Sequence, residues 1–236
     1  MAKAKIYILH GWAVDPENEQ KWSVFRQFLE EKDIETEFLG LPGLTTTLSE
    51  SWTLADYVAW LDSKLPEGES VILLGHSFGG QLAIRFASLY PDKISKLILI
   101  DSAGIRDTNP LVVAKRAIFL VLAKIGSFLT KSPIARTLLY KVIQEKDYLE
   151  ASPTLRATMR SVLHDQVLKD LPKIASPTLI VWGKFDSQTP LRLGKKFHAM
   201  IVNSEFKVIE SARHSPQFTH PAMTAQVINT FIENTV

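Results

Sequence analysis

Ser77 is the residue of this chain whose surroundings most clearly indicate chemistry. It lies at the centre of Gly75–Gly79 (Gly-His-Ser-Phe-Gly), directly after the apolar run Val71–Leu74 and directly before a stretch with helical character. A strand, a G-x-S-x-G turn and a helix in this order form a nucleophile elbow, whose tight turn exposes the serine hydroxyl to an incoming carbonyl group. The pattern predicts Ser77 Oγ as the nucleophile of an acyl-transfer reaction.

Two glycines support this interpretation, because Gly79 and Gly80 fall in the first turn of the expected helix. Each costs about 1 kcal/mol relative to alanine in a helix interior, so the pair needs a structural reason. Close packing of the helix against a strand at a strained turn supplies one. A phosphate-binding loop is the alternative, but neither G-x-G-x-x-G nor G-x-x-x-x-G-K-[ST] occurs at a strand-to-helix junction.

A serine nucleophile needs a base within hydrogen-bond reach, and the base needs a carboxylate to orient it. With this elbow the partners follow in the order Ser, Asp or Glu, His, each after a later strand. Asp186 follows the apolar run Thr178–Trp182, and His214 follows Phe206–Ile209. Because parallel strands end at one edge of a sheet, we expect Ser77, Asp186 and His214 to meet there as a catalytic triad.

Other residues compete for these roles. Asp101 also ends an apolar run and could supply the carboxylate from the neighbouring strand. The remaining histidines lie in backbone-shaping motifs, in expected helices or at a helix entry: His10, His76, His164, His198 and His220. None of them forms a spaced metal-binding motif with a carboxylate, so we expect neither a metal ion nor a cofactor.

Acyl transfer also requires hydrogen-bond donors for the oxyanion, and each donor contributes about 10²–10³ in rate. We expect one from the backbone N–H of Phe78, which follows the nucleophile at a helix N-terminus. The second is expected from the loop after the first strand, where Gly11 allows close approach and Trp12 would present its N–H. A plain core aromatic is the alternative role for Trp12.

These residues need a scaffold, and the sequence predicts an α/β fold with a mostly parallel sheet covered by helices on both faces. The expected strands are Ile6–His10, Ile34–Leu39, Val71–Leu74, Leu97–Ile100, Thr178–Trp182 and Phe206–Ile209. The expected helices are Gln20–Glu31, Thr53–Leu65, Phe78–Leu89, Leu191–Met200 and Ala222–Glu233.

Residues 105–171 interrupt this alternation. They contain no convincing strand, but helical patterns at Val112–Phe128, Ile134–Gln144 and Thr154–Leu168 predict a helical insertion over the sheet. The expected organisation is a core of residues 1–104 and 172–236 with this insertion between its parts. The insertion holds 11 Lys and Arg against 6 Asp and Glu. This excess suits a solvated helical face, or alternatively the attraction of an acidic substrate.

The bulk composition sets limits on partners. A chain of 236 residues with a net charge of +2 can form one sizeable core, and its charge is too small to indicate binding to nucleic acid or a membrane surface. The absence of cysteine excludes disulfides and thiolate metal sites. No signal-peptide pattern or membrane-length apolar stretch is present, so we expect a soluble cytoplasmic protein, monomeric or homodimeric.

Taken together, the motifs resemble the α/β-hydrolase superfamily over nearly the whole chain. The resemblance rests on His10-Gly11-Trp12, Leu41-Pro42-Gly43, the segment 75–80, the segment 177–183 with Asp186 and Pro190, and His214 followed by Pro216 and Pro221. It implies a six-stranded parallel core in the order 4-3-5-6-7-8 of the family's strand numbering, and a cap formed by the helical insertion. The family's N-terminal antiparallel hairpin is not expected here. Gly40, Thr45–Thr47 and Arg213 depart from the family's usual loop residues.

The resemblance implies a serine hydrolase that cleaves carboxylic esters with small to medium acyl chains. The expected apolar pocket is lined by Trp12, Phe78 and Leu191, and by the cap residues Phe119 and Leu122. A C–C bond hydrolase acting on a diketone acid is one alternative, since it uses the same triad and an anionic substrate would suit the basic cap. A ligand-binding protein with slow turnover is another. Ser77 argues against the branches that use Asp at the elbow.

Overall fold

The sheet of this protein has the predicted class and strand order. The computed structural model describes residues 3–106 and 151–234. Within them, six strands pair in parallel in the order β2-β1-β3-β4-β5-β6. Their bounds are β1 Ala4–Leu9, β2 Ile34–Leu39, β3 Val71–His76, β4 Ile94–Ile100, β5 Thr178–Gly183 and β6 Ser204–Ile209.

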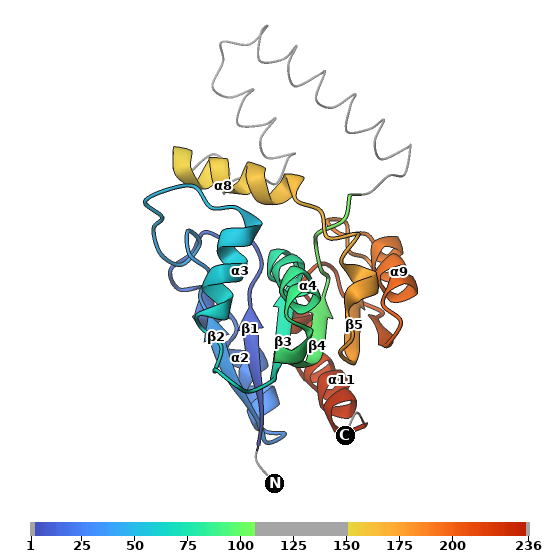
Figure 1. Cartoon of the computed structure of the whole chain (residues 1–236). Coiled ribbons are helices and arrows are strands. Elements are labelled where there is room, and N and C mark those ends of the chain that lie inside the picture. Colours follow the sequence, from blue (N-terminus) through green and yellow to red (C-terminus); the bar gives the residue numbers. More distant parts are fainter. Residues whose placement is uncertain (1–2, 107–150, 235–236) are drawn as a thin grey trace, which may run out of the picture.

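Helices cover both faces of this sheet, as Figure 1 shows. One face carries α3, α4 and α9, and the other carries α2 and α11. The described helices are α1 Asn18–Lys21, α2 Ser23–Glu30, α3 Leu54–Asp62, α4 Phe78–Leu89, α8 Pro153–His164, α9 Leu191–Met200, α10 Pro216–Thr219 and α11 Pro221–Asn234. Two short 3₁₀ turns, Pro91–Lys93 and Leu171–Lys173, lead into later strands.

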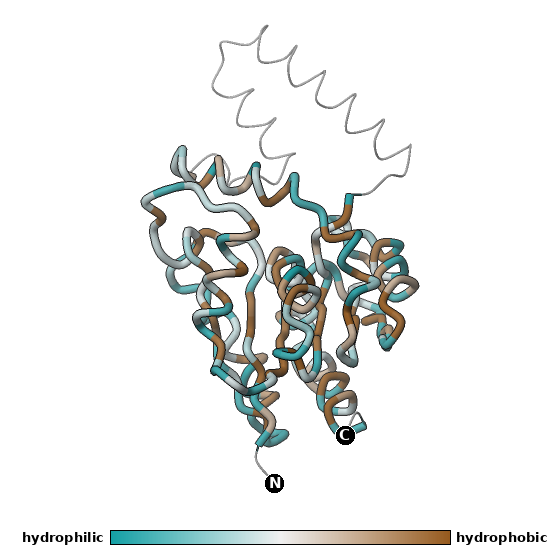
Figure 2. Tube along the Cα trace, viewed as in Figure 1, coloured by the Kyte–Doolittle hydropathy of each residue, from teal (hydrophilic) through white to brown (hydrophobic). Residues whose placement is uncertain are grey.

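Each face of the sheet has its own apolar core, and the apolar strands run through the middle of the molecule in Figure 2. Successive strand side chains point to opposite faces, so Leu97 and Leu99 join one core while Ile98 and Ile100 join the other. Every residue of β3 and β5 is buried. This double burial explains why these strands read as continuous apolar runs rather than alternating ones.

Several predicted boundaries were wrong. The expected helix Gln20–Glu31 is two helices separated by Trp22, whose fully buried ring packs edge-on against Phe25 and Phe218. The first strand begins and ends earlier than expected, and the short helix α10 was not predicted. The helix expected to reach Leu168 ends at His164, because the backbone at Asp165 is extended.

The predicted helical insertion is described only in part. Val112–Phe128 and Ile134–Gln144 lie outside the described residues, and so do Phe119 and Leu122. Its last helix, α8, crosses above the end of the sheet where the strands finish (Figure 1). None of the helices in residues 3–106 and 151–234 is long and apolar enough to cross a membrane.

Candidate active site

Ser77 occupies a strained turn between a strand and a helix. It has φ 52° and ψ −115°, a conformation rarely adopted outside glycine, and it separates β3 from α4. Hydrogen bonds fix this turn from both sides. The Ser77 carbonyl accepts the N–H groups of Gly80 at 3.0 Å and Ala103 at 2.9 Å, and the Ser77 N–H donates to Ile100 O at 3.1 Å. The side chain is half-buried.

Gly79 explains how the turn can be so tight. A Cβ atom at this position would lie 2.2 Å from the carbonyl oxygen of Leu9, which is far inside van der Waals contact. The first turn of α4 therefore packs directly on the end of β1, which is the structural reason that the two glycines required. This contact brings the loop after β1 beside the elbow.

The three residues expected to form a triad lie in one hydrogen-bonded line at the carboxyl edge of the sheet. His214 Nε2 is 3.1 Å from Ser77 Oγ, and His214 Nδ1 is 2.8 Å from Asp186 Oδ2. The His214 side chain is 13% exposed, whereas that of Asp186 is fully buried. The imidazole can therefore exchange a proton with the serine hydroxyl while its far nitrogen donates to a carboxylate that water does not reach.

Asp186 is held by several donors in the loop after β5. Its Oδ1 accepts the backbone N–H groups of Gln188 at 2.7 Å and Thr189 at 3.0 Å. Its Oδ2 lies 2.6 Å from Thr189 Oγ1. Burial by itself would raise the pKa of Asp186, but the hydrogen bonds from His214 and Thr189 and the charge of His214 outweigh burial and lower that pKa. The carboxylate is thus favoured in its ionised, accepting form.

His76 fixes the backbone of the histidine loop. Its Nε2 donates to the carbonyl oxygen of His214 at 2.8 Å, and the two rings lie with centroids 5.1 Å apart. Burial, assisted by the nearby charge of His214, lowers the pKa of His76 to about 3. His76 is therefore a neutral donor that positions His214, which sequence reasoning had treated only as part of a backbone motif.

Gly11 brings the predicted oxyanion loop against the elbow. A Cβ atom here would lie 2.8 Å from His76 Nδ1 and 3.1 Å from Ser77 Cβ. Trp12 follows, half-buried, with its ring edge-on to that of Phe78 at 5.3 Å between centroids. Among the described residues, the backbone N–H groups of Trp12 and Phe78 have no hydrogen-bond partner. Two donors are therefore available beside the serine.

A buried histidine supports this loop from beneath. The backbone N–H of Leu41 donates to His10 Nε2 at 2.9 Å, so the ring proton sits on Nδ1 and donates to the Gly11 carbonyl at 2.8 Å. Burial lowers the pKa of His10 to about 4, which keeps the ring neutral. His10 therefore ties the oxyanion loop to the loop after β2.

Asp101, the rival carboxylate, has a different set of contacts. Its Oδ1 accepts the N–H of Gly183 at 2.8 Å, and no hydrogen bond joins it to His214. Asp101, Asp186 and His214 nevertheless form the one group within residues 3–106 and 151–234 whose side-chain ligand atoms lie close enough, within 4.8 Å of one another, to suit a metal ion. The backbone and hydroxyl donors around the Asp186 oxygens account for that carboxylate without a metal.

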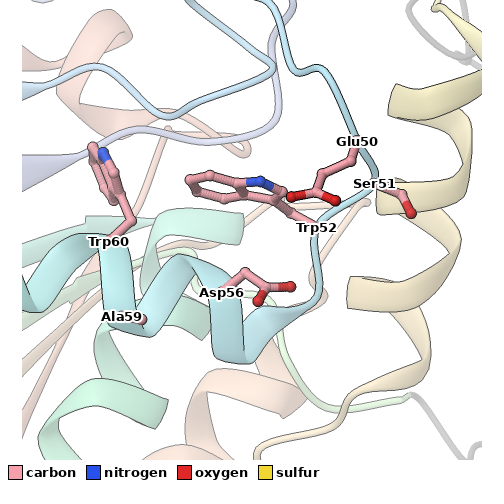
Figure 3. Close-up of a pocket in the computed structure, with 6 residues that line it drawn as sticks. All are labelled: Glu50, Ser51, Trp52, Asp56, Ala59 and Trp60. Atoms are coloured by element: carbon pink, nitrogen blue, oxygen red, sulfur yellow. The ribbon is translucent and has the colours of Figure 1, made fainter.

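A pocket of about 500 Å³ is formed by α3 and the loop before it, and none of the residues predicted to line a substrate site is among its lining residues. Its lining residues are Glu50, Ser51, Trp52, Asp56, Ala59 and Trp60 (Figure 3). A row of edge-on aromatic contacts connects it with the elbow: Trp52 on Tyr57 at 5.1 Å, and Tyr57 on Phe78 at 5.2 Å. Leu191, at the start of α9, packs on the same core as Phe78.

Thr189 is the contact residue that sequence reasoning missed. Its hydroxyl lies 2.6 Å from Asp186 Oδ2, 3.1 Å from the Asp101 carbonyl and 3.3 Å from His214 Nδ1. The only signal for it was its place between Asp186 and Pro190. Position in the sequence does not predict the direction of a side-chain hydroxyl in a loop, so the contacts of Thr189 could not be predicted.

Fold and site together define an α/β protein with a serine, histidine and aspartate at the edge of a parallel sheet. The chain belongs to the α/β hydrolase family, whose model matches residues 6–227.

Individual relatives are distant. The chain is 26% identical over 171 residues to a 2-hydroxy-6-oxononadienedioate/2-hydroxy-6-oxononatrienedioate hydrolase of Pseudomonas putida, covering 64% of this chain and 59% of that protein. It is 25% identical over 176 residues to a pimeloyl-[acyl-carrier protein] methyl ester esterase of Neisseria meningitidis, covering 68% and 69%. The chain spans 45–66% of the length of the first curated relatives it matches.

Solved structures share the fold. A thermophilic esterase from Thermogutta terrifontis superimposes with a TM-score of 0.69 at 23% identity, covering 98% of this chain and 90% of that one. At this level of identity the likeness concerns architecture alone.

Proposed function

We propose that this protein is a serine hydrolase that cleaves carboxylic esters of small to medium acyl chains through an acyl-enzyme formed on Ser77. One observation carries the proposal: the continuous line from Ser77 Oγ through His214 to the buried Asp186, with links of 3.1 Å and 2.8 Å. Nucleophile and base within hydrogen-bond reach, with the base oriented by a third group, are the signature of an activated serine.

In the proposed reaction, Ser77 Oγ attacks the ester carbonyl while His214 Nε2 takes the hydroxyl proton. The same nitrogen then returns the proton to the leaving alcohol, and Asp186 holds the imidazole in the required tautomer. The N–H groups of Trp12 and Phe78 stabilise the oxyanion. Water, activated by His214, attacks the acyl-enzyme and releases the acid. No metal ion or cofactor takes part, and the proposed substrate is a small-molecule ester.

The sharpest test combines labelling with turnover. We expect a fluorophosphonate probe to label the wild-type protein covalently and the Ser77→Ala variant not at all. Turnover of p-nitrophenyl acetate should fall about 10⁴-fold or more in that variant, because the nucleophile is gone. Ser102→Ala is a suitable control, since Ser102 lies two residues beyond the end of the neighbouring strand β4 and its hydroxyl donates to Ala103 O.

The results separate the candidate activities. Unchanged turnover or labelling in Ser77→Ala would reject Ser77 as the nucleophile. A C–C bond hydrolase is the second candidate, favoured by the relative that is named for a dienedioate substrate. Higher kcat/KM on a diketone acid than on any ester of a chain-length panel would select it. About one turnover per site would instead favour a ligand-binding role.

A further inference from the structure

Asp101 combines backbone strain with complete burial directly behind the proposed triad. It follows the last residue of β4 and has φ 42°, one of three positive φ values among the described residues other than glycine. Its side chain is buried, with a relative exposure of 0%. A non-glycine residue in this region costs of order 1–3 kcal/mol and persists only where its surroundings fix it, most often at functional sites.

One carboxyl oxygen of Asp101 has a backbone donor and the other has none. Oδ1 accepts the N–H of Gly183, whereas Oδ2 is buried and receives no donor among the described residues. The side chains of Asp101 and Asp186 share a hydrogen bond when one of them carries a proton. A ligand atom of Asp101 lies within 4.8 Å of both Asp186 and His214. Thr189 connects the backbone of Asp101 with the side chain of Asp186, because its hydroxyl lies 3.1 Å from the backbone carbonyl oxygen of Asp101 and 2.6 Å from Asp186 Oδ2.

Two carboxyl groups this close in a dry site cannot both be ionised. Asp186 faces more donors, from Gln188, Thr189 and His214, so the negative charge stays on Asp186. Burial first, and then the charge of Asp186, raise the pKa of Asp101 well above its usual range. Asp101 is thus the protonated member of the pair at neutral pH.

We propose that Asp101 is a reserve carboxyl group of the triad, neutral while Asp186 is ionised and able to orient His214 when Asp186 carries no charge. This inference rests on the proposed function, and it makes Asp101 a positioning residue rather than a catalytic one. The physical reason is that burial and the charge of Asp186 together suppress ionisation of Asp101. Asp186→Asn removes the second cause and leaves the first, so Asp101 can ionise within 4.8 Å of a His214 ring nitrogen once the pH is high enough.

Three variants test this on turnover of p-nitrophenyl acetate: Asp186→Asn, Asp101→Asn and the double variant. We expect Asp101→Asn to stay within roughly three-fold of wild type, because asparagine resembles the neutral acid in shape. The turnover rate of Asp186→Asn should fall about 10²-fold. A triad that has lost its carboxylate with no replacement loses about 10⁴-fold. The double variant should lose a further factor of about 10².

A pH profile supplies a readout that a purely structural role would not move. The titratable groups facing Asp101 are Asp186 and His214, with His76 behind the ring of His214. In Asp186→Asn, kcat/KM should keep rising as pH increases from about 7 to 9, because Asp101 must lose its proton to act. The double variant should lack this rise.

Distinct outcomes would overturn distinct claims. A double variant no slower than Asp186→Asn, or a pH profile shared by the two, would refute the reserve role. If Asp101→Asn does not fold, the pH dependence of kcat/KM in Asp186→Asn is the test. A kcat/KM that does not rise between about pH 7 and 9 would then refute the reserve role. The Ser77→Ala variant with Asp101 and Asp186 unchanged tests the proposed function separately. Turnover that persists in this variant would refute Ser77 as the nucleophile and would say nothing about Asp101.

Discussion

Ser77 and Asp101 are the two residues at which the regular backbone of the sheet is broken most sharply. Each follows the last residue of a central strand, and their φ angles are 52° and 42°. The strands β3 and β4 pair side by side, so the two turns leave the sheet next to each other. This paired departure places one hydroxyl and one carboxyl group at the same edge of the sheet.

Asp101→Asn should raise the free energy of unfolding at neutral pH. The pKa of Asp101 is raised in the native protein and returns to about 4 on unfolding. The native state therefore binds one proton more than the unfolded state above that pH, so its stability falls as pH rises. Asparagine does not titrate, so the Asp101→Asn variant does not lose stability in this way as the pH rises. In urea unfolding, the advantage of the variant should widen between about pH 5 and pH 8, by at most roughly 1.4 kcal/mol per pH unit.

Asp186→Asn provides the control of opposite sign. The pKa of Asp186 is lowered in the native protein, so its ionised form adds stability above the unfolded pKa and that stability is lost as pH falls. This variant should therefore be less stable than wild type at neutral pH. A stability difference for Asp101→Asn that does not change with pH would contradict a buried neutral acid.

At the scale of elements, α4 links the elbow with the end of α8 and the segment that follows it. Gln81 donates to Val162 O, in the last turn of α8, at 2.8 Å. Arg85 donates to Asp170 Oδ2 at 2.8 Å and to Asp165 Oδ1 at 2.9 Å. The helix that begins at the proposed nucleophile therefore also anchors the chain returning from the helical insertion.

Arg85→Ala should destabilise the fold by roughly 1–3 kcal/mol, because Asp170, whose side chain is only 10% exposed, loses its close guanidinium donor and keeps only Lys173, at 3.7 Å, as a charged partner. Urea unfolding measures this loss. Lys184→Ala is the matched control: its partner Glu210 is 72% exposed, and such surface pairs contribute about 0–1 kcal/mol. An equal decrease in the free energy of unfolding in the two variants would show that the ion pairs of Arg85 stabilise the fold no more than an exposed surface pair.

Some parts of this structure leave a clear pattern in the sequence and could be predicted from it, whereas others do not. Buried parallel strands are continuous apolar runs, so the strands themselves were predictable, whereas their order followed from the resemblance to the family. The serine motif with its ordered partners indicated the three residues that the structure brings into one hydrogen-bonded line. Thr189 and the φ angle of Asp101 depend on loop conformation, which residue types alone do not define. The break at Trp22 arises from tertiary packing of its ring, and the pocket beside Trp60 from how a loop lies against α3.

At the scale of the whole molecule, the sheet separates the described interior into two apolar cores, one on each face. Ile84 on α4 belongs to one core and Ile228 on α11 to the other, and both are fully buried. Packing changes in one core should therefore not be felt in the other.

Ile84→Val and Ile228→Val should each cost about 0.5–1.5 kcal/mol of unfolding free energy. Because the sheet separates the two sites, the double variant should equal their sum within about 0.5 kcal/mol, measured by urea denaturation. Coupling above about 1 kcal/mol would mean that the sheet transmits strain between the cores.

The distance along the chain between Ser77 and His214 has a consequence in time. The two residues are 137 positions apart. A ribosome adding about 5–20 residues per second leaves on the order of ten seconds between their appearances. During that interval the growing polypeptide contains the serine segment without its imidazole, so any hydrolytic activity that needs both can begin only after His214 has been added.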